Sequence, residues 1–203
     1  MKTSLRHVAG TVAIVTLTWM VVQHGRAGPQ DDKAEEPIDR FPRGSTQSRH
    51  EAIHVVVPSA KSYDRLRADF ESIVNRAEID IFGNLPAEEM ARNLKAMPDK
   101  YGLMILAQSE VGKRQTLLVG HPIRAKHYFV GNPLIASRMI GRHTGAALYV
   151  PLRVLIYEDE RGRAVIAYDQ PSSLLGQFRD ERVLEVARML DRKLGEIATR
   201  AAE

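Results

Sequence analysis

The stretch from Phe129 to Pro171 constrains the fold more than any other part of the sequence. It opens with a Gly-Asn-Pro turn and a short helix, since Asn caps free amides and Pro lacks the N–H that a first helical residue leaves unpaired. A strand from Leu148 to Tyr157, a charged turn and a second strand from Ala164 to Tyr168 follow. This order predicts a compact domain that mixes helices with antiparallel strands. None of it resembles a catalytic motif.

The residues before this stretch predict one strand and two helices. The β-branched run from Ala52 to Val57 is typical of a strand that ends at Pro58. An apolar stripe at three- and four-residue steps, preceded by Ser62 as a cap, predicts an amphipathic helix (Tyr63, Leu66, Phe70, Ile73, Ala77). A further helix is expected from Pro86 to Met97, because Pro suits its first turn and Pro98 stops it.

Further strands and a long final helix complete the expected domain. Strands are predicted at Leu103 to Ala107 and Lys126 to Val130, with a turn at Gly112-Lys113 that lets Thr116 to Val119 pair back as a hairpin. The short helix runs from Pro133 to about Ile140. A last apolar stripe predicts a long C-terminal helix (Val183, Ala187, Leu190, Leu194, Ile197, Ala201). The fold class is therefore α+β: a two-layer domain with a mostly antiparallel sheet of four to five strands, packed by helices.

The N-terminus predicts export from the cytoplasm. Lys2 and Arg6 precede an apolar run of 15 residues, Val8 to Val22, and small residues follow at Gly25 and Ala27. This three-part form favours a signal peptide over residues 1–27, cleaved after Ala27, because a spanning helix usually needs about 20 apolar residues. The alternative is an uncleaved anchor over residues 8–22 in the inner membrane. Both place the folded part outside the cytoplasm, in the periplasm or the medium.

Composition narrows the remaining function classes. Residues 28–50 hold three prolines and many charges but little apolar area, so we expect a disordered linker before a domain at residues 51–203. The first 27 residues hold three Lys/Arg and no Asp/Glu, which leaves 26 basic and 25 acidic residues afterwards. A basic surface for nucleic acid is therefore unsupported. The absence of cysteine excludes disulfides, thiolate metal sites and a cysteine nucleophile.

The folded part resembles a known family from about Ala52 to Leu175. The resemblance rests on AIHVVVPSAKSYDRL at the start, FVGNP at Phe129 to Pro133, VPLRVLIYED from Val150 and VIAYDQPSSLL from Val165. Their order and spacing are similar to those of the domain of unknown function 302 (DUF302) family, of the TT1751-like superfamily. The resemblance implies a TBP-like curved sheet with a long helix across it, and it implies no catalytic residue. The expected helix from Pro86 to Met97 departs from the family pattern.

An anion-binding site is predicted near the Gly-Asn-Pro turn. A helix N-terminus binds anions, and four basic side chains follow it closely in the sequence. The candidate ligand-binding residues are Asn132, Arg138, Arg142, His143 and Arg153. The alternative is that Asn132 only caps its own helix while the arginines are solvated or pair with Glu158 and Asp159.

Other chemistry has weaker support in the sequence. His54 and His127 are expected on strands, where they could meet across the sheet, but no histidine pair has helical ligand spacing and no carboxylate cluster accompanies them. We therefore expect no metal and no cofactor. Ser172 and Ser173 lack the surroundings of a nucleophile elbow and suit a helix cap better. No residue is nominated as catalytic.

Three hypotheses for function follow. The first is a periplasmic module that binds or senses a small apolar or anionic ligand between its curved sheet and its helices. The second is a homodimeric structural or interaction module without catalysis. The third is an enzyme such as a hydrolase, which the sequence supports least. A membrane partner is expected only through an uncleaved signal, and a nucleic-acid partner is not expected.

Overall fold

A computed structural model of the chain describes residues 44–77, 85–96 and 102–203. Residues 47–203 form one compact unit, and residues 44–50 are exposed and contain no helix or strand. The predicted signal peptide at 1–27 and most of the predicted linker at 28–50 lie outside the described residues. Among the residues that are described, no helix is both long enough and apolar enough to cross a bilayer.

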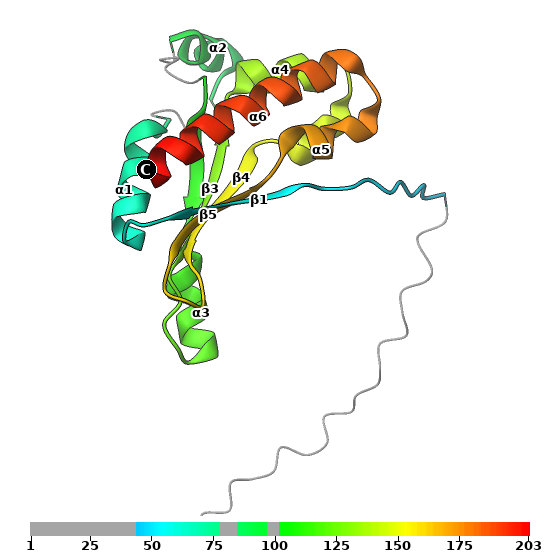
Figure 1. Cartoon of the computed structure of the whole chain (residues 1–203). Helices are drawn as coiled ribbons and strands as arrows, with labels where there is room; N and C mark the ends of the chain where they lie inside the picture. Colours follow the sequence, from blue (N-terminus) through cyan, green and yellow to red (C-terminus); the bar gives the residue numbers. More distant parts are fainter. Residues whose placement is uncertain (1–43, 78–84, 97–101) are drawn as a thin grey trace, which may run out of the picture. The chain divides into compact units, whose positions relative to one another are not determined.

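The unit is built on a curved, open sheet of five strands (Figure 1). Every neighbouring pair is antiparallel. From one edge to the other the strands are β1 (His54–Ser59), β5 (Ala164–Asp169), β4 (Leu152–Glu158), β3 (Ala125–Gly131) and β2 (Met104–Ser109). The first strand of the unit thus pairs with the last. A register shift between Ile105 and Ala107 marks a bulge in the edge strand β2.

Helices cover one face of this sheet and connect its strands. In chain order they are α1 (Tyr63–Ile73), α2 (Ala87–Ala96), α3 (Val111–Val119), α4 (Pro133–Ile140), α5 (Pro171–Leu175) and α6 (Glu181–Ala202), with two 3-10 helices, η1 (Thr144–Tyr149) and η2 (Gly176–Phe178). The long helix α6 runs across the sheet (Figure 1). Asp180 caps α6, since its carboxylate accepts from the backbone N–H groups of Arg182 and Val183. The predicted α+β two-layer class is confirmed.

The core lies between the sheet and the helices α1 and α6. Alternate strand residues, such as Val154 and Ile156 on β4 and Ile166 on β5, have no exposed surface there. Leu66 on α1 and Leu194 on α6 face them and are equally buried. On the other face, strand residues such as Val56 and Arg153 are exposed. We call these two sides the covered face and the open face.

One predicted hairpin is wrong. Residues 111–119 form the helix α3 instead of a turn at Gly112-Lys113 and a strand from Thr116. The reason is that Gly112 packs closely against the backbone of Ile123, where a Cβ would lie 2.3 Å from the carbonyl oxygen. The glycine lets the first turn of the helix pack against the chain that leads into β3, and it does not mark a reversal of direction.

Several boundaries also differ from the predicted ones. β4 starts at Leu152, because the residues before Val150 form the 3-10 helix η1. β1 continues through Pro58, which an edge strand tolerates since its missing N–H costs no ladder bond on the solvent side. α1 ends at Ile73, and Ala77 instead donates its N–H to the carbonyl of Ile105. The helix predicted from Pro86 is present as α2, whereas its predicted last residue, Met97, lies outside the described residues.

Candidate functional site

An aliphatic pocket of about 480 Å³ opens on the covered side, where α4 and α6 meet one end of the sheet. Its walls come from β2, β3, α4, α6 and the segment that leads into β4. Nearly all of the lining is hydrocarbon (Leu103, Leu106, Val130, Gly131, Asn132, Pro133, Ile135, Ala136, Ser137, Met139, Ile140, Gly141, Val150, Pro151, Leu152, Leu190). Pockets of 300–1,000 Å³ with an apolar lining and a few polar groups are the usual sites for small molecules.

The local sequence explains why α4 stands over this pocket. Asn132 accepts the N–H of Leu134 at 2.9 Å and so caps the helix, and Pro133 occupies its first turn. Ile135, Ala136 and Met139 then fall on one face of the helix, toward the sheet. A Cβ at Gly131 would meet Leu106 at 3.2 Å, so a larger residue would push against the pocket wall. Asn132 and Ser137 are the polar side chains of the lining.

Two of the predicted anion-site residues, Arg142 and His143, meet at one carboxylate. Arg142 Nε lies 2.6 Å from Asp180 Oδ2, and His143 Nε2 lies 3.3 Å from the same oxygen. The hydrogen bond from Arg142, helped by the backbone N–H groups of the α6 cap, holds the pKa of Asp180 below its ordinary value. His143 also stacks on Phe178 with ring centroids 5.5 Å apart. These contacts tie the end of α4 to the start of α6.

The other predicted residues lie apart from this pair. Asn132 lines the aliphatic pocket. Arg138 is exposed on α4 and is not part of the pocket lining. Arg153 belongs to the open face, where its guanidinium is 3.9 Å from Asp169. The five residues therefore do not surround one hollow, and their part in ligand binding stays a prediction.

The open face has two shallow hollows that share Arg153 and Asp169. They measure about 400 Å³ and about 280 Å³. His54 Nδ1 lies 2.9 Å from Asp169 Oδ1. Burial, assisted by the charge of Arg153, lowers the pKa of His127 on the same face.

His54 and His127 both line the smaller hollow, as their expected places on strands imply. Across residues 44–77, 85–96 and 102–203, no three His, Asp or Glu side chains gather in a way that could hold a metal ion.

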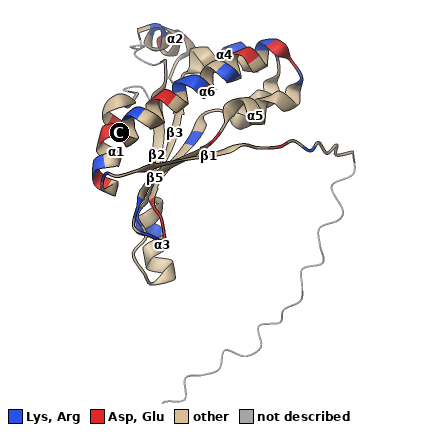
Figure 2. Cartoon of the chain, viewed as in Figure 1, with Lys and Arg blue, Asp and Glu red and all other residues tan. Residues whose placement is uncertain are grey.

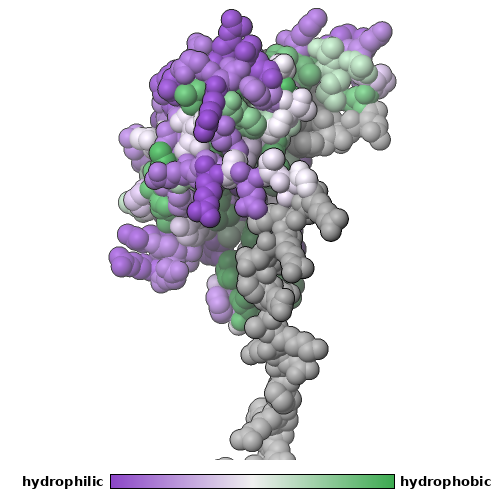
Figure 3. Space-filling view, turned by 90° about the vertical axis from the view of Figure 1, so that its right-hand side faces the viewer, coloured by the Kyte–Doolittle hydropathy of each residue, from purple (hydrophilic) through white to green (hydrophobic). Residues whose placement is uncertain are grey.

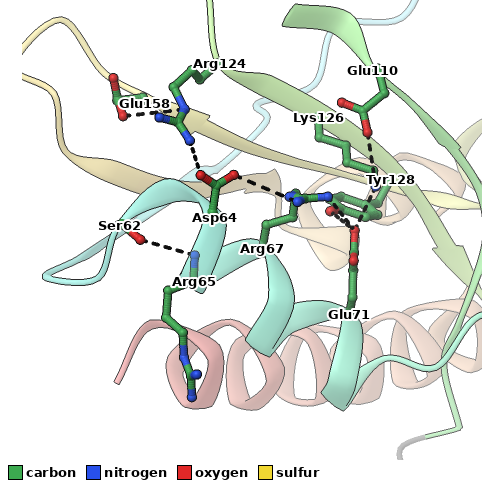
Figure 4. Close-up of polar contacts among 10 residues, drawn as sticks. All are labelled: Ser62, Asp64, Arg65, Arg67, Glu71, Glu110, Arg124, Lys126, Tyr128 and Glu158. Carbon is green, nitrogen blue, oxygen red and sulfur yellow. Dashed lines mark hydrogen bonds and ion pairs between the residues drawn. The ribbon is translucent and has the colours of Figure 1, made fainter.

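A polar network between α1 and β3 was not anticipated from the sequence (Figure 4). Glu71 accepts hydrogen bonds from Lys126 Nζ at 2.8 Å and from the Tyr128 hydroxyl at 2.7 Å. Glu110 lies 3.3 Å from Lys126 on its other side, and Arg67 is 3.8 Å from Glu71. The alternation of side chains along a strand could have predicted this network, because Lys126 lies on the same side of β3 as Tyr128 and Val130.

Burial shapes the protonation of this network. The Lys126 side chain is only 5% exposed, and it lies within ion-pair distance of two carboxylates, those of Glu71 and Glu110. Burial acts to raise the pKa of Glu71, but the hydrogen bonds from Lys126 and Tyr128 outweigh it and hold that pKa below its ordinary value. Burial and then the bond to Glu71 raise the pKa of Tyr128 far above its ordinary range. None of these residues lines the three hollows described above, which fits a structural clamp between helix and sheet.

The geometry defines a two-layer α+β domain with an apolar pocket, and comparisons with known proteins give its family. The family model named "Domain of unknown function DUF302" matches residues 83–201. The chain therefore belongs to the DUF302 family. The match begins before α2 and takes in all but the last residue of α6, whereas β1 and α1 precede it.

A solved structure is similar to this chain in fold. It is the crystal structure of an uncharacterized conserved DUF302 protein from Bacillus stearothermophilus, which is 17% identical in sequence. The superposition has a TM-score of 0.52 and covers 73% of this chain and 97% of the other. No curated protein matches the sequence. The comparisons thus establish family and fold.

Proposed function

We propose that this chain is an exported protein that binds a small apolar molecule in the aliphatic pocket beside α4. The observation that carries the proposal is the pocket itself, with about 480 Å³ of space and a hydrocarbon lining. Small residues maintain the space, since Gly131 and Ala136 stand where larger side chains would enter it. Asn132 and Ser137 at the lining suit a ligand with one polar end.

A binding experiment with a neutral fluorophore tests this proposal. 1-Aminoanthracene should bind the wild-type protein with increased fluorescence, and decanol should displace it. Ala136→Phe fills the pocket from α4, so we expect it to abolish both binding and displacement. Arg138→Phe is the matched control, because it adds a ring to the same helix outside the lining. Equal binding by the wild type and Ala136→Phe would exclude this pocket.

An anionic ligand is the second candidate, and Arg153 favours it. Its side chain is 67% exposed and approaches Asp169 only at 3.9 Å. Because His54 holds the other oxygen of Asp169, most of the guanidinium donors stay available to a ligand. Inorganic phosphate should then raise the melting temperature of the wild type but not that of Arg153→Ala. Arg138→Ala serves as the exposed control. An equal shift in all three proteins would remove Arg153 from consideration.

Export is tested by mass. We expect the chain recovered from the periplasm of an expressing cell to lack residues 1–27, because Ala27 precedes the predicted cleavage point. A full-length mass found only in the membrane fraction would support the anchor in place of the cleaved signal. A full-length mass in the cytoplasm would contradict export.

A further inference from the structure

The C-terminal half of α3 leaves three successive large aliphatic side chains in solvent. Leu117 is 86% exposed, Leu118 is 78% exposed and Val119 is 48% exposed. We call these three residues the α3 apolar tip. Single exposed leucines are common on proteins, but a contiguous group usually marks an interaction surface.

The packing of α3 shows why this tip points away from the domain. Gly112 lies against the backbone of Ile123, and the Thr116 hydroxyl accepts the N–H of Ile123 at 2.9 Å. These two positions, one helical turn apart, form the face that α3 turns toward the chain entering β3. The helix then ends at Gly120, whose φ of +77° is left-handed.

The position of α3 in the unit leaves its tip uncovered. Figure 1 shows α3 at the end of the sheet remote from α4 and α5. Figure 3 shows the unit from the side, and hydrophobic surface is visible near the lower end of its described part. The tip is therefore presented at one extremity of the described unit.

The exposed charged side chains on α3 itself have one sign. Lys113 and Arg114 are exposed on α3, which carries no acidic residue (Figure 2). Glu110, the residue before α3, lies 3.3 Å from Lys126, and Asp159 in the turn between β4 and β5 lies 2.7 Å from Arg163. Exposed hydrocarbon beside the exposed positive charge of Lys113 and Arg114 complements an anionic lipid surface.

The spacing of the tip residues distinguishes lipid from a protein groove. A groove on a partner protein contacts one face of a bound helix, through side chains three or four residues apart. Leu117, Leu118 and Val119 are consecutive, so they spread over about 200° of the helix circumference. Acyl chains in a bilayer surround an inserted helix end from all sides, so they can contact side chains that point in such different directions. The sequence also contains the apolar run Val8 to Val22, which brings the chain to a membrane as a signal or as an anchor.

We propose that the α3 apolar tip docks on the surface of an anionic lipid bilayer, with Leu117 to Val119 among the acyl chains and Lys113 and Arg114 against the headgroups. This contact is separate from the pocket beside α4 and does not depend on any ligand there. It also differs from a spanning segment, because only the end of one short helix enters the lipid.

A tryptophan reporter tests the contact in the full chain. Trp19 is the only tryptophan, so Trp19→Phe gives a silent background. Leu118→Trp places a reporter on the tip, and Leu148→Trp, at a position that is 81% exposed on η1, is the matched control. Each protein is mixed with vesicles of phosphatidylglycerol and phosphatidylethanolamine, with and without brominated acyl chains. The reporter reads α3 itself, whether or not the N-terminal run is present or inserted.

We expect the L118W emission to shift to shorter wavelength on vesicles and to be quenched by brominated lipid, while the L148W emission changes little. Lys113→Glu with Arg114→Glu should reduce the L118W response, and raised salt should do the same. An L118W emission that is unchanged by vesicles would overturn the proposal. So would equal quenching of both reporters, or a blue shift that grows with protein concentration without lipid, since the last result would assign the tip to a second copy of the chain.

Discussion

Two regions of the layer between helices and sheet are packed very differently. Beneath α1 and α6, side chains such as Phe70, Val154 and Ile166 leave no exposed surface. Beneath α4, beside β2, β3 and the start of β4, about 480 Å³ stays open. Both regions are aliphatic, so hydrophobicity alone does not distinguish a core from a pocket.

The size of the contributing residues explains the difference. α6 runs for 22 residues, and its buried stripe includes the large side chains of Val186, Leu194 and Ile197. α4 has only eight residues, and Ala136 stands among those that face the sheet. Close packing under α6 provides stability, while the short helix α4 leaves the pocket open. The predictions below test this division.

The largest effect is expected in the filled region. Leu194→Ala removes a fully buried side chain where neighbours cannot close the gap, so it should cost about 2–5 kcal/mol of the free energy of unfolding. Urea denaturation measures it. Leu134→Ala, at a 48% exposed position of α4, should cost less than about 1 kcal/mol. Similar losses in both variants would show that the core beneath α6 is loosely packed.

Larger side chains should also affect the filled core and the pocket region differently. Val154→Phe overpacks the filled core and should destabilise by about 1–3 kcal/mol. Ala136→Phe enters open space beside α4 and should change the free energy of unfolding by less than about 1 kcal/mol. Paired urea titrations decide between them. A larger loss for Ala136→Phe than for Val154→Phe would reverse the assignment of filled and open regions.

The polar clamp at the margin of the filled region should give an intermediate loss. Glu71→Gln keeps the shape but leaves Lys126, among the described residues, with Glu110 as its one close carboxylate, so we expect a cost of about 1–3 kcal/mol. Glu71 is one-third exposed, which keeps the loss below that of a fully buried pair. Glu88→Gln, at an exposed position of α2, is the control. An unchanged stability in Glu71→Gln would mean that water replaces the carboxylate freely.

The same clamp predicts a pH dependence. The pKa of Glu71 is lower in the folded protein than in the unfolded chain, where it is about 4.3. Its stabilisation is therefore fully present above that pH and is lost as the pH falls through the lowered folded value. The wild type should lose more free energy of unfolding than Glu71→Gln between about pH 5 and pH 3. Parallel acid titrations that stay a constant distance apart would contradict this.

The smallest effect is expected on the open face. Arg153→Ala removes an exposed side chain whose nearest charge is 3.9 Å away, so the free energy of unfolding should change by no more than about 0.5 kcal/mol. Thermal denaturation with and without phosphate then separates a binding role from a structural one. A loss above about 2 kcal/mol would place Arg153 in the framework of the sheet instead.

Much of the fold was predictable because its signals are local. The stripe from Val183 to Ala201 predicted α6, and the Asn132-Pro133 pair predicted α4, since each pattern needs only neighbours in the chain. α3 was missed because Gly112 serves a contact with Ile123, and that contact is invisible until the fold is known. Leu148 and Tyr149 were assigned to a strand on composition, which does not distinguish a 3-10 turn from strand pairing.

The candidate pocket was less predictable for a different reason. A pocket forms where the surrounding side chains leave space between them. Here that space depends on residues from β2 to α6, which come together only in the folded domain. Charged residues near one another in sequence, such as Arg142 and Arg153, were expected to converge but belong to different layers of the domain. The alternation of side chains along β3 places Lys126 on the covered face, although a charged residue is usually expected in solvent.

The pairing of β1 with β5 also sets the order in which the domain can be completed. His54 and its partner Asp169 are 115 residues apart in the chain. β1 is made first among the strands, yet its hydrogen-bonding edge has no partner until nearly the whole domain has been synthesised. A long wait for a distant strand slows folding and keeps the chain open. If the chain is exported unfolded, as proposed above, this late closure by its own first strand would help to keep the sheet incomplete until the chain has crossed.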